Sequence, residues 1–159
     1  MRNISSLVVV GVAFVCALSF ATTAAAQNPV GAWKVNVAKS KYSPGPAPKS
    51  STITTTAVAG GGFKSVTETV PATGAATKSE VTWMFDGKDH PVTGNPNSTA
   101  QAYTKGDATH YTAVSKVAGK VTITSKVAIA ADGKSRTSTQ TGTDAQGKTV
   151  NNMIWYDKQ

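Results

Sequence analysis

The densest group of titratable side chains lies in the segment FDGKDHP, residues 85–91. Asp86, Asp89 and His90 supply two carboxylates and an imidazole, which can hold a divalent metal, or Asp89 can orient His90 as a general base. The spacing matches no metal-binding motif, however, and Asp86-Gly87 is ordinary chemistry for a hairpin turn. Lys88 also separates the two acids. We therefore expect no metal ligands and no catalytic residues here, and a hydrolase that uses His90 is the least favoured function.

Other reactive groups are sparse. No serine lies in a Gly-x-Ser-x-Gly elbow, and His110 beside Tyr111 is expected to be an exposed or rim side chain. The single cysteine, Cys16, lies in an apolar segment near the N-terminus, so the rest of the chain cannot form an internal disulfide. The composition therefore predicts a protein that is not an enzyme and carries no cofactor.

The first 26 residues have the pattern of a secretory signal. Arg2 precedes a short apolar run from Ile4 to Phe20, and small residues at Ala24 and Ala26 indicate cleavage after Ala26. The apolar run is shorter than the roughly 20 residues that a membrane-spanning helix needs. We expect a secreted or periplasmic protein with one domain over residues 27–159 and no transmembrane segment in the mature chain.

Beyond residue 27 the chain alternates apolar and polar residues with a period of two, and it lacks the spacing of an amphipathic helix. Asp-Gly and Gly-rich turn signals of two to five residues separate the strand-like runs, which predicts hairpins. The runs are 31–37, 51–58, 63–70, 78–86, 99–105, 109–117, 120–130, 135–142 and 149–157. The pattern predicts an all-β, antiparallel up-and-down meander of about 8–10 strands that closes into a barrel.

Side-chain alternation also predicts which residues share a face. Trp33, Val35 and Val37 are expected on one face of the first strand, and Val121 is expected to share a face with Ile123. Two proline-containing segments, 38–50 and 89–98, are expected to be rigid irregular connections because proline cannot donate to a ladder. The first can be a crossover or a lid.

Two predicted strands are too polar for a dry core. Residues 135–142 are polar on both faces, and residues 51–56 carry a single large apolar side chain, Ile53. Either their hydroxyls point into a barrel wide enough for water or a ligand, or the strands lie outside a smaller core. In the last strand both faces are apolar: Met153 and Trp155 lie on one face, and Ile154 and Tyr156 lie on the other. One of these pairs must therefore pack under a loop, at the barrel end or against a partner.

A family resemblance rests on three stretches. Gly31-Ala32-Trp33-Lys34 in the first strand resembles the Gly-x-Trp of the calycins, which include the lipocalins, the fatty-acid-binding proteins and avidin. GAWKVNVAKSKYSPGPAPKS, FDGKDHPVTGNP and VNNMIWYDKQ resemble a group of small exported bacterial proteins of unknown function that are called lipocalin-like. The resemblance implies a calycin-like barrel in which Gly31 and Trp33 form a structural motif, with the indole at the closed end.

Two functional hypotheses follow. In the first, the protein binds a small apolar or amphipathic ligand inside the barrel, lined by Trp83, Phe85 and Tyr111, with Tyr42 and Lys41 at the mouth. In the second, the basic proline-rich segment 38–50 docks on an anionic envelope surface or a protein partner. Nucleic acid is not expected as a partner because the chain lacks a series of aligned stacking aromatics.

Overall fold

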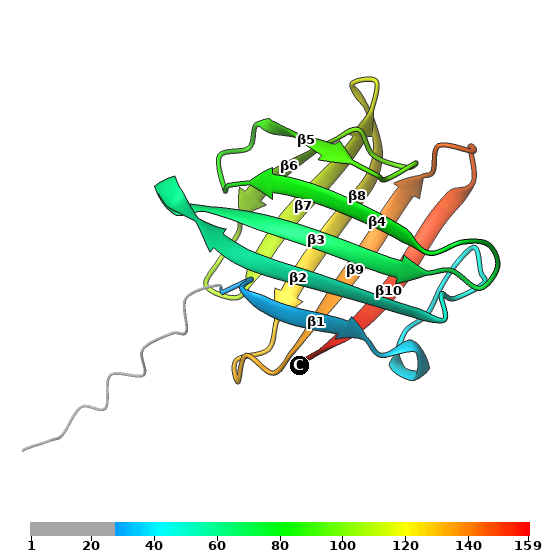
Figure 1. The fold of residues 1–159 in the computed structure, drawn as a ribbon, viewed down its shortest axis with the longest axis horizontal. Coiled ribbons are helices and arrows are strands. Elements are labelled where there is room, and N and C mark those ends of the chain that lie inside the picture. Colours follow the sequence, from blue (N-terminus) through cyan, green and yellow to red (C-terminus); the bar gives the residue numbers. More distant parts are fainter. Residues whose placement is uncertain (1–27) are drawn as a thin grey trace, which may run out of the picture.

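The computed structural model describes residues 28–159, so the predicted secretory signal over residues 1–26 lies outside the described residues. The described residues form a closed barrel of ten strands (Figure 1). The strands are β1 (Gly31–Val35), β2 (Ser50–Val58), β3 (Gly62–Val70), β4 (Thr77–Trp83), β5 (Asp89–Thr93), β6 (Ala100–Lys105), β7 (His110–Val117), β8 (Lys120–Ile129), β9 (Ser135–Thr143) and β10 (Thr149–Lys158). Each strand pairs antiparallel with its neighbours in the chain, and β1 pairs with β10 to close the barrel. The predicted all-β, up-and-down, calycin-like barrel is therefore confirmed.

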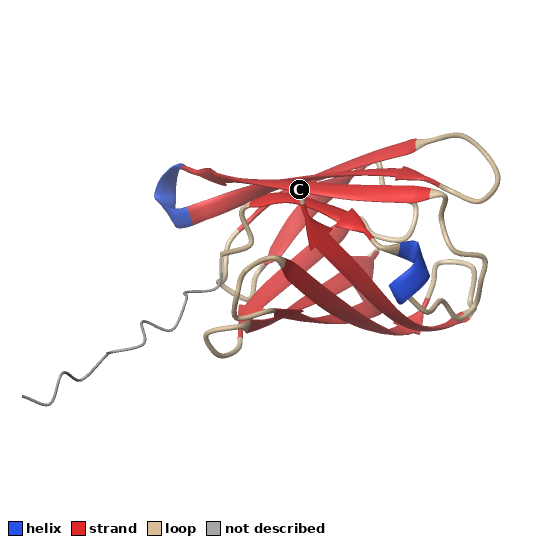
Figure 2. Ribbon diagram, turned by 90° about the horizontal axis from the view of Figure 1, so that it is seen from below, coloured by secondary structure: helices blue, strands red, loops and turns tan. Residues whose placement is uncertain are grey.

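The barrel has two different ends. We call floor the end formed by the chain before β1 and by the connections 59–61, 84–88, 106–109 and 130–134. We call mouth the opposite end, which carries the connections 36–49, 71–76, 94–99, 118–119 and 144–148. The helical turns, η1 (Val37–Lys39) at the mouth and η2 (Ala59–Gly61) at the floor, are short and lie at opposite ends of the molecule (Figure 2).

The first strand is shorter than the alternation predicted. It ends at Val35, and Val37 lies in η1 rather than on the inner face with Trp33. The side chain of Asn36 accepts a hydrogen bond from the backbone N–H of Lys39 at 3.1 Å, which caps the turn. A cap that stabilises a turn immediately after the strand therefore outweighs the alternating pattern.

The expectation of an irregular segment over 89–98 is wrong for its first half, which forms β5. His90 and Val92 continue the inward alternation, and β5 pairs with β6 through the register Asp89↔Ala102 to Pro91↔Ala100. The N–H of Val92 donates to Thr99 on the β6 side, so the nitrogen of Pro91 faces β4, where pairing extends only to Val92 and Thr93. Proline is tolerated at this position because its nitrogen, which carries no hydrogen, faces a part of β4 that does not pair with β5.

A bulge in β8 overturns the prediction that Val121 and Ile123 share a face. Ser115 pairs with Ile123, whereas the next residue of β7, Lys116, pairs with Val121, so Thr122 is the extra residue. Val121 is 58% exposed, and Thr122 is buried with its hydroxyl donating to the carbonyl of Ser115. One inserted residue reverses the alternation at this end of the strand.

The proline-rich segment after η1 closes part of the barrel wall. Lys41 exchanges two backbone hydrogen bonds with Met153 of β10, at 2.7 and 2.9 Å, and the N–H of Asn151 donates to Ser43 at 2.7 Å. Because β1 pairs only with the last residues of β10, this segment supplies hydrogen-bond partners to the rest of that strand. The segment is therefore attached to the barrel wall along β10, and we call this attached part, residues 40–49, the seam.

The two apolar faces of β10 are explained by the same seam. Ile154 and Tyr156 point inward and are buried. Trp155 lies on the outside, where its backbone N–H donates to the hydroxyl of Ser40 at 2.9 Å and the ammonium of Lys39 lies 4.9 Å from its ring centre. Trp155 thus packs beneath the connection after β1, whereas Met153 of the same outer pair stays 38% exposed.

Candidate ligand site in the barrel interior

The floor of the barrel is built around Trp33. Its side chain is 0% exposed, and its indole N–H donates to the carbonyl of Pro29 at 2.8 Å. Gly31 has φ +130°, a backbone conformation that L side chains rarely adopt, so any other residue at this position would be strained. The Nζ of Lys158 lies 5.2 Å from the indole centre. The motif predicted to close one end of the barrel therefore lies at the floor.

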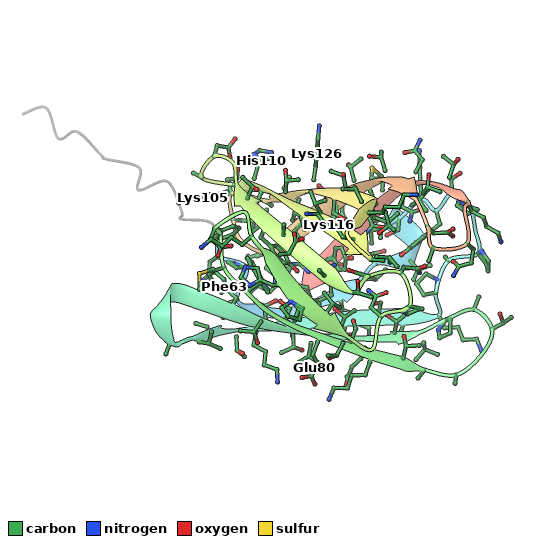
Figure 3. The ribbon with its side chains drawn as sticks, turned by 90° about the horizontal axis from the view of Figure 1, so that it is seen from above. Phe63, Glu80, Lys105, His110, Lys116 and Lys126 are labelled. Carbon is green, nitrogen blue, oxygen red and sulfur yellow. The ribbon has the colours of Figure 1, made fainter. Side chains whose placement is uncertain are left out.

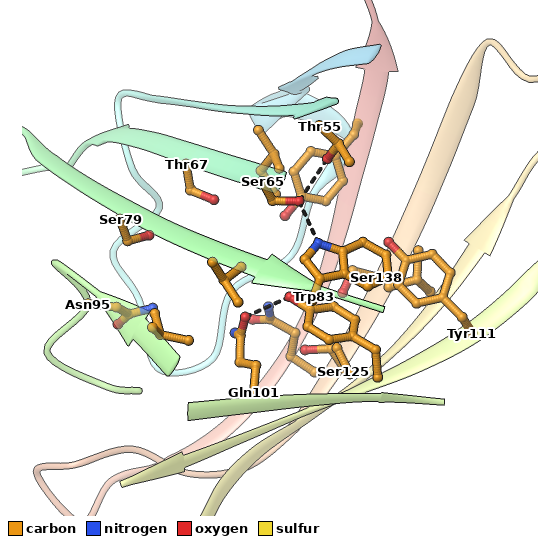
Figure 4. A pocket seen from close by; sticks show the side chains of 18 of the residues that line it. Thr55, Ser65, Thr67, Ser79, Trp83, Asn95, Gln101, Tyr111, Ser125 and Ser138 are labelled. Carbon is orange, nitrogen blue, oxygen red and sulfur yellow. Dashed lines mark hydrogen bonds between the residues drawn. The ribbon is translucent and has the colours of Figure 1, made fainter. Parts of the chain in front are cut away.

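A cavity of about 220 Å³ lies above this floor, enclosed by side chains from most of the strands (Figure 4). Its lining mixes apolar and polar side chains in similar numbers, and the polar ones are mostly hydroxyls and amides. The lining residues are Ser51, Ile53, Thr55, Ser65, Thr67, Ser79, Val81, Trp83, Val92, Asn95, Gln101, Tyr103, Tyr111, Ala113, Ser125, Val127, Arg136, Ser138, Gln140 and Tyr156. The polar strands β2 and β9 thus point hydroxyls into an open interior, which settles the question left by their composition.

The apolar part of the lining is an aromatic cluster. Trp83 stacks on Tyr103 with ring centres 3.9 Å apart and contacts Phe63 at 4.7 Å. Phe85, in the connection after β4, packs edge-on against Trp83 with the two ring centres 5.1 Å apart. Phe85 also packs against Tyr111 at 5.5 Å, so Trp83 and Tyr111 both belong to this cluster and present apolar surface to the cavity.

The polar part of the lining is ordered by hydrogen bonds between neighbouring strands. The hydroxyl of Ser65 lies 2.9 Å from that of Thr55 and accepts the indole N–H of Trp83, also at 2.9 Å (Figure 4). The hydroxyl of Tyr103 donates to Gln101 at 2.7 Å, and the amide of Gln101 donates to Ser115. Burial raises the pKa of Tyr103, so this phenol stays protonated and remains a donor at neutral pH.

The cavity continues toward the mouth. A second space of about 300 Å³ is lined by Pro44, Asn95, Asn97, Ser98, Gln101, Ser115, Ile123, Ser125, Gln140, Asp144, Val150 and Asn152. Asn95, Gln101, Ser125 and Gln140 line both spaces, so the two spaces are adjacent inside the barrel. The side chains become more polar, and richer in amides, from the floor to the mouth.

Arg136 is a buried cavity residue that the sequence analysis did not single out. It is 5% exposed and lines the cavity, and its guanidinium carbon lies 4.7 Å from the ring centres of both Trp33 and Tyr156. Its Nη1 is 3.4 Å from the hydroxyl of Tyr111. One signal was available: Arg136 is the only arginine after Arg2 in a chain that otherwise uses lysine for its positive charges.

The other residues predicted for the site are spread over three environments. Trp83 and Tyr111 line the cavity, whereas Phe85 packs against the aromatic cluster behind it. Tyr42 is half-buried against the core, and burial raises its pKa. Lys41 is exposed on the seam beside Met153. Neither Tyr42 nor Lys41 is among the residues that line the two spaces.

The titratable cluster of FDGKDHP is divided between two partners. His90 contacts Asp86 at 2.9 Å, whereas Asp89 forms an ion pair with Lys116 at 2.8 Å. Asp89 therefore does not orient His90. Within residues 28–159 no three His, Cys, Asp or Glu side chains are grouped as a metal site.

The outer surface carries most of the charge. His110 and Lys126 project outward from β7 and β8, away from Glu80 on the far side of the barrel (Figure 3). His110 contacts Asp107 at 2.8 Å, and the backbone N–H of Thr109 together with this ring lowers the pKa of Asp107 to about 2. Among the described residues, no helix has the length and apolar character needed to cross a membrane.

Comparisons with other proteins leave this interior as the main guide to function. The chain matches no protein-family model, no curated protein and no solved structure.

Proposed function

We propose that this protein is an exported binding protein that holds a small amphipathic molecule inside its barrel without changing it covalently. The observation that carries the proposal is the pair of adjacent spaces inside the barrel, about 220 Å³ at the floor and about 300 Å³ toward the mouth. Together these spaces reach the range of roughly 300–1,000 Å³ that is usual for small-molecule sites. The secretory pattern of residues 1–26 supports a role outside the cytoplasm.

The lining favours an amphipathic ligand over a purely apolar one. Apolar ligand surface buried against Trp83, Tyr111 and Val127 contributes roughly 25 cal/mol per Å² before the cost of ordering the ligand. A purely apolar molecule would also cover the hydroxyls of Ser125 and Ser138 without replacing their water, which costs free energy for each unpaired group. A ligand with apolar and hydrogen-bonding parts satisfies both surfaces.

Native mass spectrometry of the protein purified gently from its own source tests the proposal. We expect a reproducible small adduct that is released on denaturation. In Ser125→Leu, the larger side chain points into the interior, so the adduct should be lost while the fold is retained. Thr124→Leu is the matched control, because Thr124 precedes Ser125 on β8 and its side chain lies on the opposite, outer face of the strand.

Two results would contradict the proposal. One is a protein that carries no small molecule and also binds none of the compounds used below. The other is an adduct that both leucine variants retain equally, which would place the molecule outside the barrel. In the first case the basic segment 38–50, with Lys39, Lys41 and Lys49, becomes the surface to test, through salt-dependent binding to anionic vesicles.

A further inference from the structure

Arg136 is a buried cation without a counter-charge. It is 5% exposed, and the residues that line the cavity around it include no aspartate or glutamate. Among residues 28–159, none of the ion pairs involves Arg136. Burying a charge is unfavourable unless it is paired and hydrogen-bonded, so an arginine in this position requires an explanation.

The contacts of Arg136 within the protein use only part of its hydrogen-bonding capacity. The rings of Trp33 and Tyr156 stabilise the positive charge through cation–π contacts at 4.7 Å. A guanidinium has five N–H donors, yet its hydrogen bond to a described residue is the one from Nη1 to Tyr111, at a long 3.4 Å. The buried Nε has no hydrogen-bond partner within residues 28–159.

The phenol of Tyr156 does not neutralise this charge. Burial raises the pKa of Tyr156 to about 12, although the nearby Arg136 acts in the opposite direction. Tyr156 is therefore uncharged at neutral pH, and the deep end of the cavity keeps one positive charge. An anion that entered this end would meet a guanidinium already held in place and a phenol on Tyr111 able to donate to it.

We propose that the ligand is a compact organic monoanion whose carboxylate binds the guanidinium of Arg136 at the deep end of the cavity. This inference rests on the proposed function, because it names the class of molecule that the interior holds. A single cavity charge matches a carboxylate better than a phosphate monoester, which carries about 1.5 to 2 negative charges at pH 7. The floor space of about 220 Å³ requires a compact apolar body.

The orientation of the ligand follows from the same gradient of side chains. The carboxylate lies beside Arg136 and Tyr111, and the apolar body lies against the aromatic cluster. Any further polar groups then face Asn95, Gln140 and the other amides toward the mouth. The surface lysines take no part in recognition, because no lysine lines either space.

The test compares carboxylates with their neutral amides, which have nearly the same shape. The pairs are benzoate and benzamide, phenylacetate and phenylacetamide, and hexanoate and hexanamide, each titrated into the full protein by calorimetry. We expect at least one carboxylate to bind about 10- to 100-fold more tightly than its amide, the range for a hydrogen bond to a charged group. The preference should persist at 500 mM salt, because a buried pair is screened much less than surface charges.

Variants then assign the preference to one side chain. Arg136→Gln should bring the carboxylate-to-amide ratio close to one, and Arg136→Lys should retain part of it because the charge is kept. Lys126→Gln removes the same charge from the outer surface and should leave the ratio unchanged. Circular dichroism of each variant establishes that the barrel is folded before binding is compared.

The outcomes separate this inference from the proposed function. If amides bind as tightly as carboxylates, or if the preference survives Arg136→Gln, the interior still binds ligands but the role of Arg136 is refuted. If none of the six compounds binds the wild-type protein, the anionic site is refuted, and a protein purified without an adduct then refutes the proposed function as well. The wild-type comparison alone decides the matter if Arg136→Gln does not fold.

Discussion

Replacing Trp33 with alanine is expected to destabilise the barrel by about 4–6 kcal/mol. A fully buried tryptophan costs roughly 3–5 kcal/mol when it is truncated to alanine, since both burial and packing are lost. The change also removes one of the two rings that stabilise the buried guanidinium of Arg136, worth about 0.5–2 kcal/mol, and leaves the carbonyl of Pro29 without its donor. Against a typical total stability of roughly 5–15 kcal/mol, such a loss brings the protein close to unfolding.

The assay is urea unfolding followed by far-ultraviolet circular dichroism, which does not depend on the tryptophan that is removed. Trp155→Ala is the matched control, because this indole lies on the outer side of β10 and is only half-buried. Its N–H donates to Asp157 at 2.9 Å, so the control also loses one hydrogen bond and one cation–π contact. We expect about 1–2 kcal/mol for the control, within the common range for a single substitution.

Trp33→Phe isolates the polar contribution. It keeps an aromatic ring beneath Arg136 but removes the indole N–H that bonds to Pro29, so a loss of about 1–3 kcal/mol is expected. The reasoning is refuted if Trp33→Ala costs no more than Trp155→Ala, because burial at the floor would then contribute nothing special. It is also refuted if the phenylalanine and alanine variants are equally unstable.

Two further predictions concern the backbone and the pH dependence. Gly142→Ala should destabilise the barrel by about 2 kcal/mol more than Gly147→Ala in the same urea assay. Both glycines have positive φ, but of the two only Gly142 would place an added Cβ against a backbone oxygen, that of Thr122. Equal losses of stability in the two variants would refute this contact. Because the pKa of Tyr156 is raised to about 12 in the folded state from about 10 when unfolded, its contribution to stability is present below pH 10 and is lost as the pH rises toward 12. Melting temperatures from pH 9 to 12 should therefore fall less steeply in Tyr156→Phe than in wild type, and parallel curves would contradict the assignment.

The candidate site was predictable to the extent that it depends on local alternation. Trp83 and Tyr111 were expected to face the interior, and they line the cavity because each is on the inner side of its own strand. Lys41 belongs to the mouth connection 36–49, but its backbone pairs with Met153, more than a hundred residues away in sequence, and its side chain lines neither interior space. No local sequence pattern predicts the contact between the connection 36–49 and β10.

The charge at the floor shows the same division. The sequence shows Arg136 as an isolated arginine in a polar strand. The two aromatic rings that contact its guanidinium belong to Trp33 and Tyr156, at opposite ends of the described chain. A strand pattern has a period of two and assigns each residue to one of two faces. It does not say which other strand the chosen face will meet.

The sequence alone determined the meander of antiparallel strands, because alternation and tight Gly-containing turns act between residues that are close in the chain. Only the tertiary structure decided which residues of β1 and β10 pair to close the barrel, that a bulge at Thr122 turns Val121 outward, and that an open cavity remains. These features depend on how side chains from distant strands fill a shared volume. That volume is settled only when the sheet closes.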